Sequence, residues 1–90
     1  MSVGRYVRIT GRVQGVFFRA WSKQQAQSLG VTGWIRNCPD GTVETKLAGD
    51  EEAVVQLIDR LREGPPGAKV DHVEVADVAA EVFDRFEVRH

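Results

Sequence analysis

The sequence predicts an α+β sandwich in which two helices cover one face of an antiparallel sheet. Two observations carry this prediction. Apolar and polar residues alternate along four segments, as in strands with one buried face, and two other segments repeat apolar residues at helical spacing. In chain order these segments give β-α-β-β-α-β, followed by a short fifth strand. The 90 residues suffice for one such domain, over residues 1–90.

The first strand and the first helix are predicted in the N-terminal third of the chain. Val7 and Ile9 alternate with polar neighbours along Tyr6–Arg12, which favours a strand. A helix is expected over Ala20–Leu29, and Gly30 suits its C-terminal cap. Helical spacing places four residues on one face, namely Phe18, Ser22, Ala26 and Leu29.

A β-hairpin is predicted next. Strand-like segments occupy Val31–Asn37 and Thr42–Ala48, and the turn signal Pro39-Asp40-Gly41 lies between them. Alternation along the second of these segments places three side chains on one face, namely Val43, Thr45 and Leu47.

The second helix carries the clearest periodic signal in the chain. Asp50 is expected to cap its N-terminus, and Gly64-Pro65-Pro66 should end it. The spacing i, i+3, i+4 and i+7 is filled by Val54, Leu57, Ile58 and Leu61. The last two strands are predicted over Val70–Val78 and Phe86–Arg89.

This order of elements is that of the ferredoxin-like sandwich, a split β-α-β arrangement. Its four main strands lie antiparallel in the spatial order 4-1-3-2, with both helices on one face. The first two strands of the chain then run parallel to each other, separated by the third. Their C-terminal ends therefore reach the same edge of the sheet.

The loop Gly11–Arg19 follows the first strand at that edge. It is predicted to be a phosphate-binding loop, called the phosphate cradle below. A loop that opens a helix presents unpaired backbone N–H groups at the positive end of the helix dipole. Gly11 and Gly15 let the backbone approach a ligand closely. Arg19 adds a permanently charged, planar fork of donors that suits phosphate oxygens.

Asn37 ends the second strand at the same edge. Two inter-strand spacings place it roughly 10 Å across from the loop. A side-chain amide both donates and accepts hydrogen bonds, so it can hold a water beside a bound anion. The sequence thus predicts a binding loop with a polar group opposite it.

Composition and isolated residues exclude several other classes of protein. The formal net charge of −1 gives no basic field for nucleic acid. Cys38 is the only cysteine, and Glu44 stands where a cysteine phosphatase has arginine, so a nucleophilic role is not expected. His72 and His90 lack ligand spacing, so no metal is expected. No apolar stretch approaches the roughly 20 residues of a membrane span, and a cytoplasmic location is expected.

Two motifs give the chain a resemblance to the acylphosphatases of the common small type. The first reads Ile9-x-Gly11-x-Val13-Gln14-Gly15-Val16-x-Phe18-Arg19. The second reads Gly33-Trp34-Ile35-Arg36-Asn37, followed by Gly41, Val43 and Gly49. Ile35 departs slightly, since the family more often has valine or alanine there, and no functional effect is expected. The resemblance covers essentially the whole chain.

The resemblance implies hydrolysis of acyl phosphates to a carboxylate and inorganic phosphate, without a metal or cofactor. It assigns Asn37 to orienting the attacking water. It assigns the phosphate to Arg19 and to the backbone N–H groups of Gln14, Gly15, Val16, Phe17 and Phe18. A carboxylate leaving group needs no general acid, whereas the identity of a base stays open. The acyl group is expected to extend into solvent, with weak specificity, and a monomer is expected, with neither nucleic acid nor membrane as partner.

Two alternatives belong to other classes. A non-catalytic module of the same fold would bind a small anion without turnover. An excised carbamoyl-phosphate-handling domain of a larger maturation protein would share the fold, although the start at Met1 and the end after the last strand argue against it.

Overall fold

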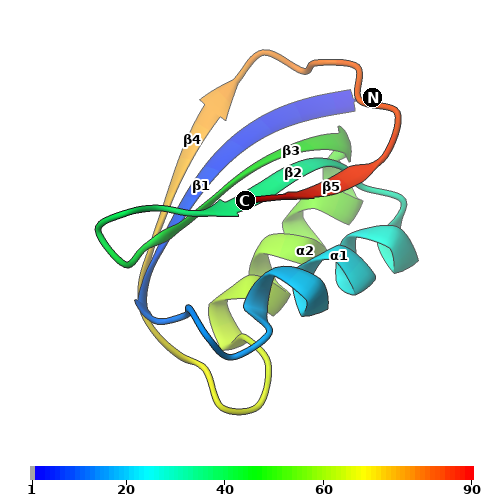
Figure 1. The fold of residues 1–90 in the computed structure, drawn as a ribbon. Helices are drawn as coiled ribbons and strands as arrows, with labels where there is room; N and C mark the ends of the chain where they lie inside the picture. Colours follow the sequence, from blue (N-terminus) through cyan, green and yellow to red (C-terminus); the bar gives the residue numbers. More distant parts are fainter. Residues whose placement is uncertain (1) are drawn as a thin grey trace.

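The computed structural model describes residues 2–90, which form five strands and two helices (Figure 1). The elements are β1 (Ser2–Arg12), α1 (Phe18–Leu29), β2 (Thr32–Asn37), β3 (Val43–Asp50), α2 (Glu51–Glu63), β4 (Lys69–Val78) and β5 (Phe86–Arg89). Both helices pack on one face of the sheet, as predicted, and the other face carries no helix.

The sheet has the strand order β4-β1-β3-β2-β5. Its first four strands pair antiparallel, which confirms the predicted order 4-1-3-2. The short C-terminal strand is confirmed as well, and it pairs parallel to β2. Because β5 runs in the same direction as β2, its end reaches the edge of the sheet where Asn37 lies.

Several element boundaries differ from those predicted, most clearly the starts of β1 and α1. Strand β1 begins at Ser2 rather than Tyr6, because its first residues pair with the end of β3. Helix α1 begins at Phe18 rather than Ala20, and the N–H of Trp21 donates its first helical hydrogen bond to the carbonyl of Phe17. The predicted turn at residues 39–41 and the Asp50 cap position both agree with the structure.

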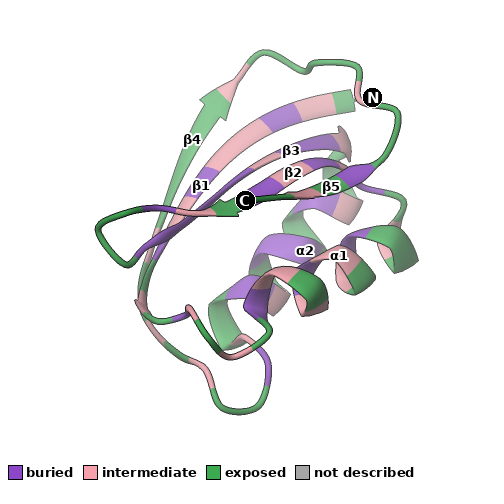
Figure 2. Ribbon diagram, viewed as in Figure 1, coloured by how far each residue is buried: buried purple, intermediate pink, exposed green. Residues whose placement is uncertain are grey.

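The core lies between the sheet and the helices (Figure 2). Every apolar position of the predicted α2 face is buried, as is most of the α1 face. On the sheet, alternation buries Val7 and Ile9 of β1 completely, and the same holds for Val43, Thr45 and Leu47 of β3. This burial fixes the register, since a slip of one residue would turn these side chains to the helix-free face.

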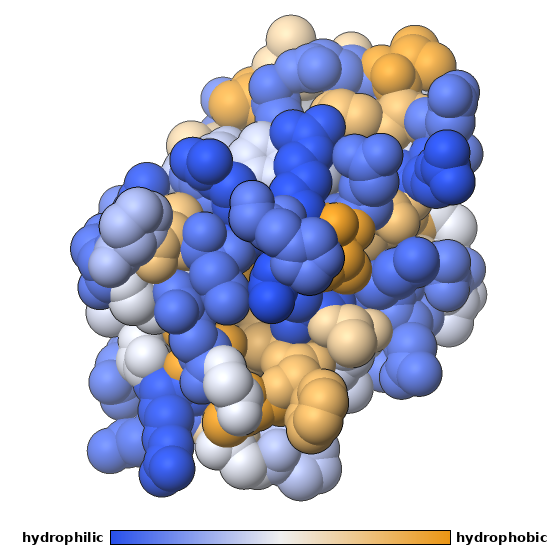
Figure 3. Space-filling model, viewed as in Figure 1, coloured by the Kyte–Doolittle hydropathy of each residue, from blue (hydrophilic) through white to orange (hydrophobic). Residues whose placement is uncertain are grey.

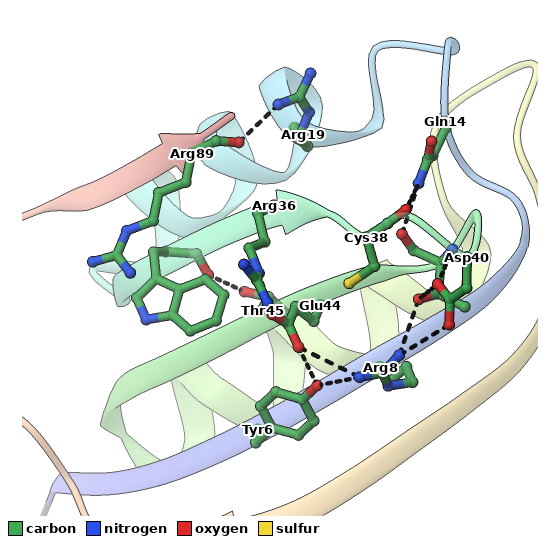
Figure 4. Close-up of polar contacts among 12 residues, drawn as sticks. Tyr6, Arg8, Gln14, Arg19, Arg36, Cys38, Asp40, Glu44, Thr45 and Arg89 are labelled. Atoms are coloured by element: carbon green, nitrogen blue, oxygen red, sulfur yellow. Dashed lines mark hydrogen bonds and ion pairs between the residues drawn. The ribbon is translucent and has the colours of Figure 1, made fainter.

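A carboxylate lies between two arginines on the helix-free face. Glu44 of β3 pairs in register with Arg8 on β1 and with Arg36 on β2. Its side chain is buried and forms ion pairs with both guanidinium groups, while the Tyr6 hydroxyl donates to it (Figure 4). Burial by itself would raise the pKa of Glu44, but the hydrogen bonds from Tyr6 and Arg36 hold that pKa below its ordinary value.

Replacing Glu44→Gln is expected to lower the free energy of unfolding by about 2 kcal/mol at pH 7, because hydrogen bonds to a charged acceptor are lost. A carboxylate with a depressed pKa stabilises the fold above its unfolded pKa, and this contribution disappears as the pH falls through the folded pKa. The gap between variant and wild type should therefore begin to close as the pH falls below about 4.3, the ordinary pKa of a glutamate. Urea unfolding at several pH values measures this difference in the free energy of unfolding. Glu63→Gln, at an exposed position, is the control. A gap that stays constant down to pH 2.5 would contradict the assignment.

Candidate active site

The loop between β1 and α1, residues 13–17, has backbone donors without partners in the described part of the protein. Gly15 has a φ of 73° and Phe17 a φ of 60°, both in the left-handed region. Within residues 2–90, no acceptor pairs with the backbone N–H groups of residues 14–20. Successive unpaired N–H groups at the start of a helix form a concavity that favours an anion. The loop therefore presents unpaired backbone donors where the sequence predicts a phosphate cradle.

The side chain of Gln14 holds this loop against the β2–β3 hairpin. Its Nε2 donates to the carbonyl oxygen of Cys38 at 2.9 Å and to that of Thr42 at 2.8 Å (Figure 4). The two carbonyls lie on opposite sides of the turn that follows Asn37. Sequence reasoning considered only the backbone of Gln14 and missed this contact.

The turn itself is rigid through hydrogen bonds of its own. The Cys38 N–H donates to the carbonyl of Thr42 at 2.8 Å, which closes the hairpin. Asp40 accepts from both the hydroxyl and the N–H of Thr42. These hydrogen bonds hold the pKa of Asp40 below its ordinary value. Asn37 thus precedes a turn that is fixed on both sides.

An open pocket of about 350 Å³ lies where the loop, α1, β2 and β5 meet. Arg19 and Asn37 both line it, so the structure brings together the two side chains that the sequence singled out. Of the loop residues assigned to phosphate, the pocket lining includes Gly15, Phe17 and Phe18, but not Gln14 and Val16. The remaining lining residues are Val13, Ala20, Val88 and His90.

Arg19 is held by the end of β5. Its Nη1 donates to the carbonyl oxygen of Arg89 at 2.8 Å and lies 3.2 Å from Nδ1 of His90. A guanidinium has five N–H donors, so these contacts leave the Nε and Nη2 donors for a ligand. The role of β5 escaped sequence reasoning, because the parallel pairing that brings Arg89 to this edge has no local signal.

Asn37 has a buried polar atom that the protein leaves unsatisfied. Two buried side-chain oxygens lack a hydrogen-bond partner within residues 2–90, namely Asn37 Oδ1 and Ser22 Oγ. Leaving a buried acceptor unpaired costs about 1–3 kcal/mol. Ser22 lies inside the core, whereas Asn37 faces the pocket. Asn37 thus lines the pocket with an amide whose buried oxygen the described part of the protein leaves unpaired.

The remaining sequence candidates lie away from this geometry. Cys38 is a buried free thiol beside the pocket and is not part of its lining. Over the described part of the chain, no three His, Cys, Asp or Glu residues cluster as metal ligands would. No helix formed by these residues is long and apolar enough to cross a membrane.

The fold and the pocket define a class of small α+β sandwich proteins with a donor-rich loop at one sheet edge. The sequence matches the acylphosphatase family over residues 5–88. An acylphosphatase from Rhizobium etli is 56% identical over 68 residues, which are 76% of this chain and 72% of that protein. The chain belongs to the acylphosphatase family and is a hydrolase of acyl phosphates.

Two further relatives cover nearly the whole chain. An acylphosphatase from Acidovorax sp. is 49% identical over 88 residues, which are 98% of this chain and 91% of that protein. The solved structure of an acylphosphatase from Coxiella burnetii has a TM-score of 0.94 at 36% identity. The match covers 98% of this chain and 93% of the Coxiella burnetii chain. The family fold therefore extends over both helices and all five strands described above.

Replacing Gln14→Ala is expected to lower the free energy of unfolding by about 1–2 kcal/mol, because two hydrogen bonds between loop and hairpin are lost. Gln14→Glu should cost at least as much, since a carboxylate cannot donate to the two carbonyls. Urea unfolding measures both variants, and Gln24→Ala on the exposed face of α1 is the matched control. Equal stability of Gln14→Ala and the control would show that the contact does not hold the loop.

Proposed function

We propose that this chain hydrolyses acyl phosphates to a carboxylate and inorganic phosphate without a metal. A water oriented by Asn37 attacks phosphorus in line, while Arg19 and the backbone N–H groups of residues 14–18 bind the phosphoryl oxygens. One observation carries the proposal. Asn37, whose buried Oδ1 has no partner among the described residues, lines the same pocket as Arg19 and the donor-rich loop.

Charge neutralisation by the loop and Arg19 supports phosphate binding. The loop N–H groups lie at the N-terminus of α1, where the helix dipole is positive. The first turn of α1 contains no acidic residue that would oppose an anion. The Nε and Nη2 donors of Arg19 match two phosphoryl oxygens at once. These groups need little reorganisation during the reaction, because the loop is already held by Gln14.

The amide of Asn37 supports placement of the water. A side-chain amide both donates and accepts hydrogen bonds, so Asn37 can hold a water with a lone pair directed towards phosphorus. The fixed turn at Cys38–Thr42 limits how far Asn37 can move. Positioning and charge stabilisation are the main demands of phosphoryl transfer through a loose transition state.

The leaving group explains why the reaction needs no Asp or Glu in the pocket as a general acid. As the new bond from water to phosphorus forms, the bond to the acyl oxygen breaks and its electron pair leaves on a carboxylate. The protons of the water leave with the inorganic phosphate. A carboxylate is stable unprotonated at neutral pH, so no general acid is needed. The pocket lining accordingly contains no Asp or Glu.

The proposal also covers the oligomeric state, the kind of substrate and the location of the chain. We expect a monomer that takes a small-molecule substrate in the cytoplasm. The large apolar side chains that it exposes are scattered over the loop before α1, α2, β4 and the segment before β5. They form no continuous patch of the kind that marks a stable interface.

Replacing Arg19→Lys should lower kcat/KM for benzoyl phosphate about 100-fold or more, because an ammonium group cannot bind two phosphoryl oxygens as a planar fork does. Loss of benzoyl phosphate followed by ultraviolet absorbance measures the rate. The matched control is Arg62→Lys at an exposed position on α2. Wild-type protein that binds phosphate without hydrolysing any acyl phosphate would instead favour the non-catalytic module.

Replacing Asn37→Ala should lower kcat about 100-fold, since the water loses its orienting group. The free energy of unfolding should not fall, because the substitution removes a buried oxygen that has no partner. Steady-state kinetics and urea unfolding of the same preparation test both parts. Turnover within threefold of wild type would remove Asn37 from the mechanism.

A further inference from the structure

Phe17 combines two unfavourable features at the mouth of the pocket. Its side chain is 86% exposed, and its φ of 60° lies in the left-handed region. It is the only residue other than glycine with a positive φ among residues 2–90. Glycine adopts this backbone conformation without strain, whereas phenylalanine does not. A large ring at this position therefore serves neither backbone geometry nor burial in the core.

The ring stands among the residues that line the pocket. Phe17 follows directly after the donor-rich loop and precedes Phe18 and Arg19 in α1. Val13 and Phe18 are buried and form the floor, so the exposed ring of Phe17 belongs to the rim. Figure 3 shows apolar surface gathered low on this face, over the region where the loop enters α1 in Figure 1.

The pocket is larger and more apolar than a phosphate requires. Its volume of about 350 Å³ falls in the range of sites that enclose small organic ligands. Apolar side chains contribute to it from the loop, α1 and β5, namely Val13, Phe17, Ala20 and Val88. Phosphoryl oxygens gain nothing from such groups, whereas the organic part of a substrate does.

A role in protein association does not account for the exposed ring. The other large exposed apolar residues are Val55 on α2, Val75 on β4 and Val82 before β5. None of these three lines the pocket with Phe17. A single ring without apolar neighbours from these elements is too small for an interface. It lies instead beside Arg19, where a bound phosphate would present its acyl group.

We infer that Phe17 is a specificity-determining residue whose ring contacts the acyl group of aromatic acyl phosphates. The inference rests on the proposed function, because the acyl group reaches the ring only when its phosphate occupies the loop. An aromatic acyl group stacks against the Phe17 ring and removes apolar surface of both from water. An acetyl group is too small to make this contact. The chain therefore selects among acyl groups, in contrast to the weak specificity expected from the sequence.

The test compares benzoyl phosphate with acetyl phosphate in wild type and in Phe17→Gly. The ratio of their kcat/KM values is expected to fall about tenfold in the variant, mainly through the KM for benzoyl phosphate. Any effect of the substitution on the phosphate cradle acts on both substrates and cancels in the ratio. Phe17→Asn is the second variant, since asparagine tolerates a positive φ without an aromatic ring. Both variants should show the same fall.

Three outcomes decide the inference. Val82→Ala removes another highly exposed apolar side chain, away from the pocket, and should leave the ratio unchanged. A ratio unchanged in both Phe17 variants would overturn the inference while leaving the proposed hydrolysis intact. Wild-type protein that hydrolyses neither substrate would overturn the proposed function, and the role of Phe17 with it. A fall in the ratio confined to the Phe17 variants would support the assignment.

Discussion

The pairing of β3 with both β1 and β2 is the constraint on which the pocket depends. Because β3 runs antiparallel to each neighbour, β1 and β2 run in the same direction and end at one edge. The loop that follows β1 and Asn37 at the end of β2 meet there. Glu44 reinforces this pairing across all three strands through Arg8 and Arg36. The ion pairs on the helix-free face thus stabilise the strand arrangement that places the pocket at the sheet edge.

The pocket departs from the rules that the rest of the chain follows. Elsewhere in residues 2–90, apart from the unpaired Ser22 hydroxyl in α1, buried strand and helix positions are apolar or paired, which is how a sequence specifies a single fold. At the pocket, the amides of residues 14–20 and the Asn37 oxygen lack partners, and Phe17 adopts a strained backbone conformation. Such departures concentrate where a ligand supplies the missing contacts. Their coincidence at one edge is the physical argument for the proposed site.

Much of the fold could be predicted because its signals are local. The spacing of the apolar residues of α2 and the alternation in β3 each lie within one segment, and both were confirmed. Gly33 shows that a residue of a motif can be required by packing and need not act in the reaction. It belongs to the second motif, yet a Cβ there would lie 1.8 Å from the Lys46 carbonyl oxygen. Close strand packing requires glycine at this position, whatever role the motif has in the reaction.

The sequence by itself determined the elements, their order and the residues at the sheet edge, because hydrophobic periodicity and turn chemistry act over a few neighbouring residues. Only the tertiary structure decided how those residues are held. Gln14 reaches the hairpin 24 residues further along the chain, and Arg19 reaches the Arg89 carbonyl 70 residues away. These contacts depend on which strands become neighbours. The order of the first four strands followed from the predicted fold class, whereas the parallel pairing of β5 with β2 is set by packing of the whole core, and no local pattern records it.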